Sequence, residues 1–452
     1  MKYFLNEKLI PDDGSKKVLS DLERKVKKEN IEISVFPDIH YKKGSSVTNG
    51  LLTKSKNRIL TSMLGVTNCG FTFGKIESSE LDDQAILSMS KSYSKKLESY
   101  SKKIKFSKED ISNMFVEYAL KELDKDPSLK DVFGLQTKED IEIEFNRLIP
   151  KKIIKAAQVS LGTLGGGNHF FEIQKAQEVY QKDSRLNTGD YVYILHSDSI
   201  AVGNLIQIYY SNLNELWYLK GLKRLISLSV YRMRQLSYFG FKTKTLFSDF
   251  KNTTKLIYGK DPHRCISSES IVGQNLLKSY FFASIFGEMN RDMIVSEFFN
   301  SARSSNGKIS DLRFGSHSHD SISVEIYDGQ SFIVQRNGVQ HLKDSSLFAL
   351  PGALGTESYI MANPHNYSAY RSSNHGVGRI MDKHVAKGAF SESATIEKLN
   401  RTGIKIFKVG SGSISEQDPD AFKDVEQVVK EMEHQSLGNR FARLFPICSL
   451  KG

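Results

Sequence analysis

This sequence of 452 residues has few cysteines and no long apolar run, and its first residues do not resemble a leader sequence. Its three cysteines, Cys69, Cys265 and Cys448, are too few and too scattered for a disulfide framework. No run of about 18 apolar residues occurs, so we expect no membrane-spanning helix. The opening MKYFLNEKLIPDDG contains acids and lacks a long apolar core, unlike a signal peptide. We therefore expect a soluble, cytoplasmic protein with no membrane partner.

Acidic residues are outnumbered by basic ones, which gives a net charge of +11. This balance favours anionic partners such as nucleic acid or nucleotides, although a lysine-rich composition alone gives the same value. Residues 216–248 contain no acid, seven lysines or arginines, and interleaved tyrosines and phenylalanines. Cations contact phosphates and aromatic rings stack on bases, so this segment is a candidate nucleic-acid face. A helical pair with a solvated basic side and an aromatic core side explains it equally well.

Several segments carry the patterns of regular structure. Residues 31–36 and 191–195 are typical of strands, and Asp328-Gly329 predicts a hairpin between 322–327 and 331–335. Apolar residues recur at helical spacing over 86–104, and Ser107 to Asp110 is typical of a capping box before another helix. Near the end of the chain, Asp418-Pro419 predicts a helix start, with Asp418 as cap. The apolar stripe expected for this helix consists of Phe422, Val425, Val429 and Met432. This mixture, without a βαβ rhythm, predicts an α+β fold.

The most informative stretch is residues 160–173, SLGTLGGGNHFFEI. Three consecutive glycines come directly before Asn168 and His169, and Glu172 follows. Glycine lets the backbone adopt positive φ and approach a ligand closely. A bare backbone beside converging polar groups suits a phosphate, a metal ion or both. Taken alone, the three glycines fit a generic turn equally well.

Four histidines stand where short apolar or glycine-rich segments stop: His169, His196, His319 and His375. Cys69 also lies against a glycine, in Thr-Asn-Cys-Gly. Thiolate and imidazole are ligands that suit manganese, zinc, iron or cobalt. A single histidine at a strand end is more often a hydrogen-bonded core residue, but several such positions beside glycine favour a metal site.

These motifs together resemble the RtcB-type RNA ligases. The matching segments run in family order from about residue 36 to 452 and include PDIH at 37–40, FFASIFGEMNR at 281–291, SHSHD at 316–320, PGALGTESY at 351–359 and SNHGVGR at 373–379. The resemblance implies a single compact unit over 1–452. Its mixed and antiparallel sheets are expected to be flanked by helices around a central metal and nucleotide cleft, with 80–150 and 205–290 mainly helical.

The resemblance also implies a chemistry. Such enzymes use GTP and one or two Mn²⁺ ions to join an RNA 3′-phosphate or 2′,3′-cyclic phosphate to a 5′-hydroxyl. By this likeness His375 is the nucleophile that attacks the α-phosphate of GTP and becomes guanylylated. The expected partner is RNA with broken ends, with tRNA as one candidate, and an activating protein is compatible with the same likeness.

Site residues carried over by the resemblance fall into two groups. The metal ligands are Cys69, His169, His196 and His319. The guanylate pocket comprises Asn168, His169, Phe170, Phe171, Glu172, His319, Asp320, Pro351, Gly352, Ala353, Leu354, Ser358, Gly376, Val377, Gly378, Arg379, Phe422 and Lys451. Glu172 suits the N–H groups of the guanine edge. Lys451 requires the end of the chain to fold back into the pocket.

This chain departs from the family pattern close to the expected chemistry. The family has an aspartate three residues before the metal-binding cysteine, whereas position 66 is Val66 and residues 61–76 contain no acid. Asp198 stands at a glycine position and Ile200 at an arginine position. Further changes are Asp320, Ala353, Phe422 and the segment Gln335-Arg336-Asn337-Gly338-Val339. Asp198 or Asp320 could replace the missing charge.

Three hypotheses remain open at this stage. The first is a divergent but active RNA ligase, supported by the intact segment around His375. The second is a catalytically impaired RtcB-like protein that binds RNA, supported by the missing aspartate. The third is a metal-dependent nucleotidyl transferase that acts on something other than broken RNA.

Overall fold

The computed structural model describes residues 1–10, 12–41, 45–64, 68–78, 81–100, 106–149, 151–198, 202–203, 263–306, 308–410 and 412–452. The basic segment 216–248, Val66 and Ile200 lie outside the described residues. Strands and helices are mixed along the chain without a repeating βαβ unit, so the predicted α+β class is confirmed. None of the described helices is both long enough and apolar enough to cross a bilayer.

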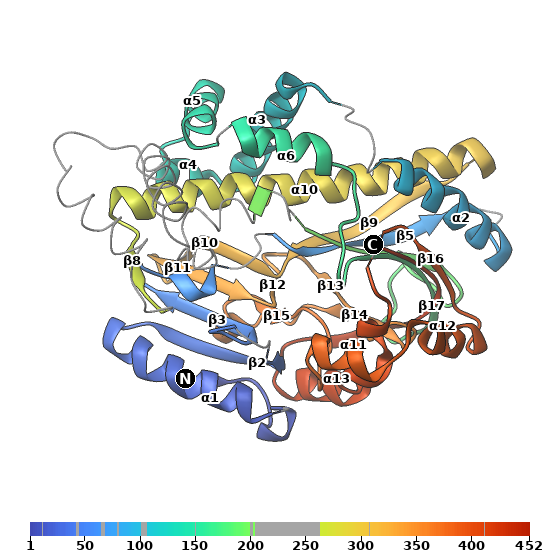
Figure 1. Ribbon diagram of the computed structural model, residues 1–452. Coiled ribbons are helices and arrows are strands. Elements are labelled where there is room, and N and C mark those ends of the chain that lie inside the picture. Colours follow the sequence, from blue (N-terminus) through green and yellow to red (C-terminus); the bar gives the residue numbers. More distant parts are fainter. Residues whose placement is uncertain are drawn as a thin grey trace, which may run out of the picture.

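An eight-stranded sheet runs through the middle of the molecule (Figure 1). Its strands pair in the order β13, β14, β17, β6, β7, β5 and β9, and β16 pairs with β17. Neighbours are antiparallel except β16 and β17, which are parallel. The bounds are β5 Gly70–Glu77, β6 Phe170–Val179, β7 Tyr191–Ser197, β9 Ser310–Ser318, β13 Leu347–Leu350, β14 Ser358–Ala362, β16 Lys405–Lys408 and β17 Asn439–Lys451.

A second sheet of five strands lies on the N-terminal side, in the order β1, β2, β3, β11 and β10. The predicted hairpin joins β10 to β11, and both of its turn residues, Asp328 and Gly329, have positive φ. The strand predicted at 31–36 runs on to His40. The bounds are β1 Lys2–Tyr3, β2 Glu32–His40, β3 Asn49–Ser55, β10 Asp320–Tyr327 and β11 Gln330–Asn337, with the small pairs β4 Arg58–Leu60 with β8 Cys265–Ser267 and β12 Val339–His341 with β15 Ser372–Asn374.

Helices cover the sheets from several sides. The long helix α10 (Ile271–Asn306) passes along one face of the central sheet, with α3, α5 and α6 above it in Figure 1. Ser107 and Asp110 form the predicted capping box of α3. The remaining bounds are α1 Asp13–Val26, α2 Asp83–Tyr100, α3 Lys108–Lys125, α4 Pro127–Phe133, α5 Lys138–Leu148, α6 Lys151–Ser160, α11 Lys383–Ala389 and α12 Glu392–Arg401, with short 3-10 turns at Glu7–Leu9, Lys27–Glu29, Thr61–Met63, Tyr367–Ala369, Ser415–Gln417 and Pro419–Ala421.

The helix predicted to begin at Asp418-Pro419 was placed too early. Pro419 opens a 3-10 turn that ends at Ala421, and the α-helix α13 spans Val425–His434 with Asp424 as its cap. The reason is a competing set of backbone bonds, because the N–H of Lys423 donates to Gly378 O at 3.0 Å. Phe422 is therefore extended and lies outside the helical stripe.

Apolar side chains pack on both faces of the central sheet. Phe171 contacts Tyr93 of α2 and Phe298 of α10, and Tyr193 contacts Phe299 of α10. Alternation along a strand turns the next residues to the opposite face. There Phe73 and Ile194 pack among residues of β14 and β17. Burial on both faces fixes the register of β6 and β7, and with it the ends of these strands.

Candidate metal and nucleotide site

Strand register brings the four predicted metal ligands together where neighbouring strands of the central sheet begin or end. His169 comes just before β6, Cys69 just before β5, His196 lies near the end of β7, and His319 follows β9. Gly70 pairs with Ser197 and with Ser318, and Phe170 pairs with His196. Because neighbouring strands are antiparallel, the beginnings of β5 and β6 meet the ends of β7 and β9.

The side chains of these four residues converge on one another. Cys69 Sγ lies 3.1 Å from His196 Nε2 and 3.5 Å from His169 Nε2. His196 Nε2 is 3.0 Å from His319 Nε2. All four residues are at most 5% exposed. Ligand atoms bound to a common ion at 2.0–2.3 Å stand roughly 3–4 Å apart, so this spacing suits coordination.

Electrostatics also fits a cation. Burial and the adjacent imidazoles hold the pKa of His196 well below its usual value, so the ring is neutral and can act as a ligand. Its Nδ1 lies 3.2 Å from the carbonyl oxygen of Asn168, which directs Nε2 into the cluster. Burial raises the pKa of the Cys69 thiol well above normal. A divalent ion would reverse this effect by stabilising the thiolate.

His375 lies beside this cluster, in the loop after β15. Its ring centroid is 4.7 Å from that of His319. The Nδ1 atom contacts Asp38 Oδ2, and the His375 backbone N–H donates to the same oxygen at 3.1 Å. Burial disfavours the charged imidazole, but Asp38 outweighs it and raises the pKa of His375 above its usual value. The geometry therefore holds one ring nitrogen and directs the other, Nε2, away from Asp38.

The glycines of the GGGNH segment and of the HGVGR segment have different roles. A Cβ added at Gly166 or Gly167 would meet no atom within 4 Å, so space is open above this loop. Gly376 is nearly as open, with Pro351 O at 3.4 Å from the added atom. Gly378 has φ +76°, and its added Cβ would lie 2.4 Å from Asp38 O. Gly378 therefore allows close packing against Asp38, whereas the other three leave room for a ligand.

A hydrogen-bonded chain joins several residues of the predicted guanylate pocket. Gln174 Nε2 donates to Glu172 Oε1 at 2.5 Å and lies 3.0 Å from Ser358 Oγ. Ser358 Oγ also accepts from the Gly352 N–H at 3.1 Å. Burial raises the pKa of Glu172 to about 7. Pro351, Ala353 and Leu354 belong, with Gly352, to the turn between β13 and β14.

The last strand carries Lys451 to this pocket. Lys451 pairs with Phe170 in the sheet and is 3% exposed. Its Nζ donates to His169 O at 2.9 Å. Burial lowers the pKa of Lys451 to about 7. The structure thus places this lysine inside the protein, against the residue that opens β6.

The side chains of the remaining predicted pocket residues differ in their exposure and contacts. The guanidinium of Arg379 lies 4.3 Å from the ring centre of Phe422 and donates to Glu416 O at 2.7 Å. The side chain of Asn168 is exposed. Phe171 and Val377 are at most 2% exposed and pack in apolar core clusters. The side chains of these two residues therefore belong to the core.

Three of the residues that differ from the family pattern form hydrogen bonds to the backbone of neighbouring segments. Asp320 Oδ1 accepts from the Gly338 N–H at 2.7 Å, which ties it to a turn. Gln335 bonds both backbone groups of Leu60, at 2.7 and 3.0 Å. Asn337 Nδ2 donates to Thr48 O at 2.8 Å. These side chains join neighbouring strands beside the site.

Two buried polar residues of α10 hold the loops of the cluster, and they were not singled out from the sequence. Asn290 accepts from Gly162 N at 2.7 Å and donates to Ser197 Oγ at 3.0 Å. Arg291 is fully buried and donates to Asn68 O at 2.8 Å. Both residues directly follow the apolar run 280–289, which only Ser284, Gly287 and Glu288 interrupt, and this position could have drawn attention to them in the sequence. Asp38 and Gln174 were likewise not assigned a role.

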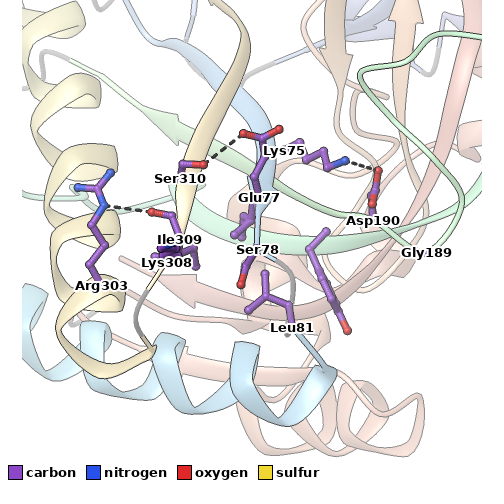
Figure 2. Close-up of a pocket in the computed structure, with 12 residues that line it drawn as sticks. Lys75, Glu77, Ser78, Leu81, Gly189, Asp190, Arg303, Lys308, Ile309 and Ser310 are labelled. Atoms are coloured by element: carbon purple, nitrogen blue, oxygen red, sulfur yellow. Dashed lines mark hydrogen bonds and ion pairs between the residues drawn. The ribbon is translucent and has the colours of Figure 1, made fainter.

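A separate groove lies at the other end of the same strands (Figure 2). It is lined by the end of β5 and the starts of β7 and β9. Along β5, the pair Ile76–Tyr191 at the groove is six residues from the pair Gly70–Ser197 at the histidine cluster. Lys75 pairs with Asp190 at 2.8 Å, and Ser310 donates to Glu77 at 3.2 Å. Lys75 and Asp190 thus pair with each other at this groove, in contrast to the donor atoms that converge at the cluster.

Comparisons with known proteins identify the family of this chain. The family model described as tRNA-splicing ligase RtcB matches residues 25–452. Similar curated proteins include an RNA-splicing ligase RtcB of Mycobacterium bovis, 26% identical over 65% of this chain and 65% of its own length. Another is a tRNA-splicing ligase RtcB of Nanoarchaeum equitans, 25% identical over 65% of this chain and 60% of its own length. The chain thus matches less than two thirds of the length of either relative. Because the family model covers almost the whole sequence, this chain belongs to the RtcB family.

Proposed function

We propose that this protein is a GTP- and Mn²⁺-dependent RNA ligase that works through a guanylylated His375. The observation that carries the proposal is the convergence of Cys69, His169, His196 and His319 beside the His375 ring. The relatives' names, RNA-splicing and tRNA-splicing ligase, support RNA as the substrate. The ends to be joined are a 3′-phosphate or 2′,3′-cyclic phosphate and a 5′-hydroxyl.

The first step uses the pair of Asp38 and His375. Asp38 holds Nδ1, so Nε2 is the nitrogen that attacks the α-phosphorus of GTP. A P–N bond forms and the P–O bond to pyrophosphate breaks. The open backbone at Gly166, Gly167 and Gly376 gives the phosphate room.

The second and third steps transfer and release GMP. Water first opens a 2′,3′-cyclic phosphate to the 3′-phosphate, which breaks the P–O bond to the 2′ oxygen and leaves a 2′-hydroxyl. An oxygen of the RNA 3′-phosphate then attacks the phosphorus held by His375, and the P–N bond to His375 breaks. The RNA 5′-hydroxyl then attacks the activated 3′-phosphate, which forms the new phosphodiester and displaces GMP. The proton of the hydroxyl leaves to a base or to solvent.

Different residues are available to bind a divalent cation and the guanine base. A cation at Cys69, His196 and His319 would neutralise charge on the phosphates during transfer. Glu172 is the group proposed to accept from the N–H edge of guanine. Because burial raises its pKa to about 7, a bound N–H donor would favour the ionised form.

Labelling tests this proposal directly. The protein is incubated with Mn²⁺ and GTP labelled at the α-phosphate, and we expect acid-labile label on the wild type and none on His375→Ala. His384→Ala is the matched control, because that histidine is exposed on α11. Addition of RNA with a 3′-phosphate and a 5′-hydroxyl should discharge the label and give the joined strand. Unlabelled wild type that still binds RNA would instead favour the catalytically impaired alternative.

A further inference from the structure

A hollow of about 510 Å³ lies where the hairpin of β10 and β11 meets the turn before β15. Four aromatic rings line this aromatic hollow: Tyr327, Phe332, Tyr367 and Tyr370. The ring centroids of Tyr327 and Tyr370 are 5.4 Å apart, and Tyr367 is 60% exposed. Ile326, which also lines the hollow, is 50% exposed. Large apolar side chains gathered at one open hollow are a feature of binding surfaces.

Cations stand against these rings. Lys54 Nζ is 4.3 Å from the ring centre of Phe332 and 4.7 Å from that of Tyr370. The guanidinium of Arg371 is 5.2 Å from the ring centre of Tyr367. Positive groups held beside aromatic faces offer a ligand both a stacking surface and a counter-charge.

The balance of charge at the aromatic hollow is positive. Lys2 lines it together with Lys54 and Arg371, whereas its one acid is Asp328, exposed at the tip of the hairpin. The Lys54 and Arg371 head groups also lie 3.1 and 3.2 Å from acids outside the lining, Glu32 and Asp344. Lys2 is exposed, and its Nζ donates to Ser368 O at 3.0 Å. An ammonium has three N–H donors, so Lys2 is the cation best able to meet a phosphate.

The aromatic hollow and the proposed catalytic site lie at opposite ends of the same strand. β10 begins at Asp320, directly after His319, and ends at Tyr327. Seven steps of about 3.3 Å place these two ends roughly 23 Å apart. On the neighbouring segment, Tyr370 comes five residues before His375, with β15 between them. A chain-like ligand that occupies the catalytic site thus has a second surface within its reach.

We propose that the aromatic hollow binds an unpaired stretch of RNA, with a base stacked on the exposed ring of Tyr367 and a phosphate beside Lys2. Unpaired bases present their faces to aromatic rings, whereas a duplex hides them in its own stack. The positive lining favours a polyanion over a neutral protein surface. This inference rests on the RNA substrate of the proposed function and adds a surface that holds the RNA away from its reacting ends.

RNA binding by the full chain tests the proposal without any reaction. The probe is a fluorescent single-stranded RNA of about 20 nucleotides with a 3′-hydroxyl, longer than the 4–16 nucleotides of common single-strand sites, and GTP and Mn²⁺ are left out. Anisotropy titration should show affinity about 5- to 100-fold lower for Tyr367→Ala, the loss of one stacked base. Tyr180→Ala is the matched control, because Tyr180 is 41% exposed and does not line the hollow.

Two further variants separate stacking, charge and folding. Tyr367→Phe keeps the ring and should bind as the wild type does. Lys2→Gln should lower the slope of log affinity against log salt by about 0.7, the value for one phosphate contact on a single strand. Lys95→Gln, exposed on α2, should leave the slope unchanged. A duplex of the same sequence should bind wild type and Tyr367→Ala alike.

Equal affinity of wild type, Tyr367→Ala and Lys2→Gln for the single strand would overturn the proposal. Self-association that Tyr367→Ala abolishes, with RNA binding unchanged, would also overturn it and assign the hollow to a second copy of the chain. Labelling of His375 is measured separately, with GTP and without RNA. Absent labelling with RNA binding that depends on Tyr367 would count against the ligase function and leave this inference standing.

Discussion

Asp38 contacts His375 through one carboxylate oxygen, which meets both the ring Nδ1 and the backbone N–H of that histidine. Asp38 is fully buried, and its own strand is held by Lys423, whose Nζ donates to Pro37 O and Ile39 O at 2.7 Å each. His40 stacks near the same ring, with centroids 6.4 Å apart. The orientation of the proposed nucleophile therefore depends on residues more than 330 positions away in the sequence.

Replacing this carboxylate should change both the rate and the pH profile of guanylylation. Only the neutral ring of His375 can attack phosphorus, and Asp38 raises its pKa above the usual value, so labelling should rise with pH until the ring is neutral. In Asp38→Asn the midpoint should move to lower pH, while the plateau rate falls about 100-fold because the ring is no longer oriented. Labelling rates across pH at saturating GTP measure both. An unchanged midpoint and plateau would contradict this role, and Asp328→Asn should leave both as in the wild type.

Local sequence patterns predicted several elements of the fold, but they could not predict which site residues come together. The hairpin at Asp328-Gly329 and the capping box at Ser107 depend on neighbouring residues, and both are confirmed. The helix start at Asp418 was wrong because a distant partner, Gly378, bonds the backbone there. Family motifs pointed to the histidines, but their spacing depends on strand register, which no short segment contains. The same limit applies to Asn290, whose partners come from two separate segments, 162–163 and 197–198.

The buried pair Glu172 and Lys451 should give stability an unusual dependence on pH. Burial raises the pKa of Glu172 to about 7, so between pH 4.5 and 7 the folded state keeps a proton that the unfolded state has lost, and stability falls as pH rises. Burial lowers the pKa of Lys451 to about 7, so above pH 7 the unfolded state holds the extra proton and stability rises toward pH 10.5. The contribution of the pair should therefore be lowest near pH 7.

Two substitutions separate these contributions. Glu172→Gln should remove the decline between pH 4.5 and 7, which amounts to at most about 3 kcal/mol at 1.4 kcal/mol per pH unit. Lys451→Met should remove the rise above pH 7 and extend the acidic decline to higher pH, because the Lys451 charge lowers the pKa of Glu172. Denaturant unfolding of each variant across pH measures both effects. Parallel curves for wild type and variants would show that neither group changes its charge on folding.

The ion pair of Glu325 and Arg336 should be important for stability above pH 5. Arg336 is 0% and Glu325 10% exposed in their side chains, and they are joined by two bonds of 2.5 and 3.1 Å. Burial alone would raise the pKa of Glu325, but the Arg336 charge outweighs it and holds the pKa well below normal. The stabilisation is present above the unfolded pKa and is lost as pH falls below it.

Glu325→Gln should therefore destabilise the protein by about 3–5 kcal/mol at pH 7, because it leaves a buried guanidinium without its counter-charge. The difference from wild type should shrink as pH falls below about 4.3. Unfolding in urea at several pH values measures this. Glu397→Gln is the matched control, because its pair with Arg401 is exposed and should contribute less than about 1 kcal/mol. A constant difference at all pH values would argue against the depressed pKa.

Asn290 should control metal affinity without contacting the metal. Its side chain bonds Gly162 N, Thr163 O, Ser197 Oγ and Asp198 O, so one residue fixes the loops on which His169, His196 and Asp198 depend. Asn290→Ala should lower Mn²⁺ affinity about 10- to 100-fold, the range found when groups behind metal ligands are removed. The unfolding free energy should fall by about 2 kcal/mol, because buried polar partners lose their bonds. Asn300→Ala, on an exposed turn of the same helix, should change neither. Loss of stability with unchanged affinity would mean that Asn290 supports the fold alone, because the ligands would then hold their positions without it.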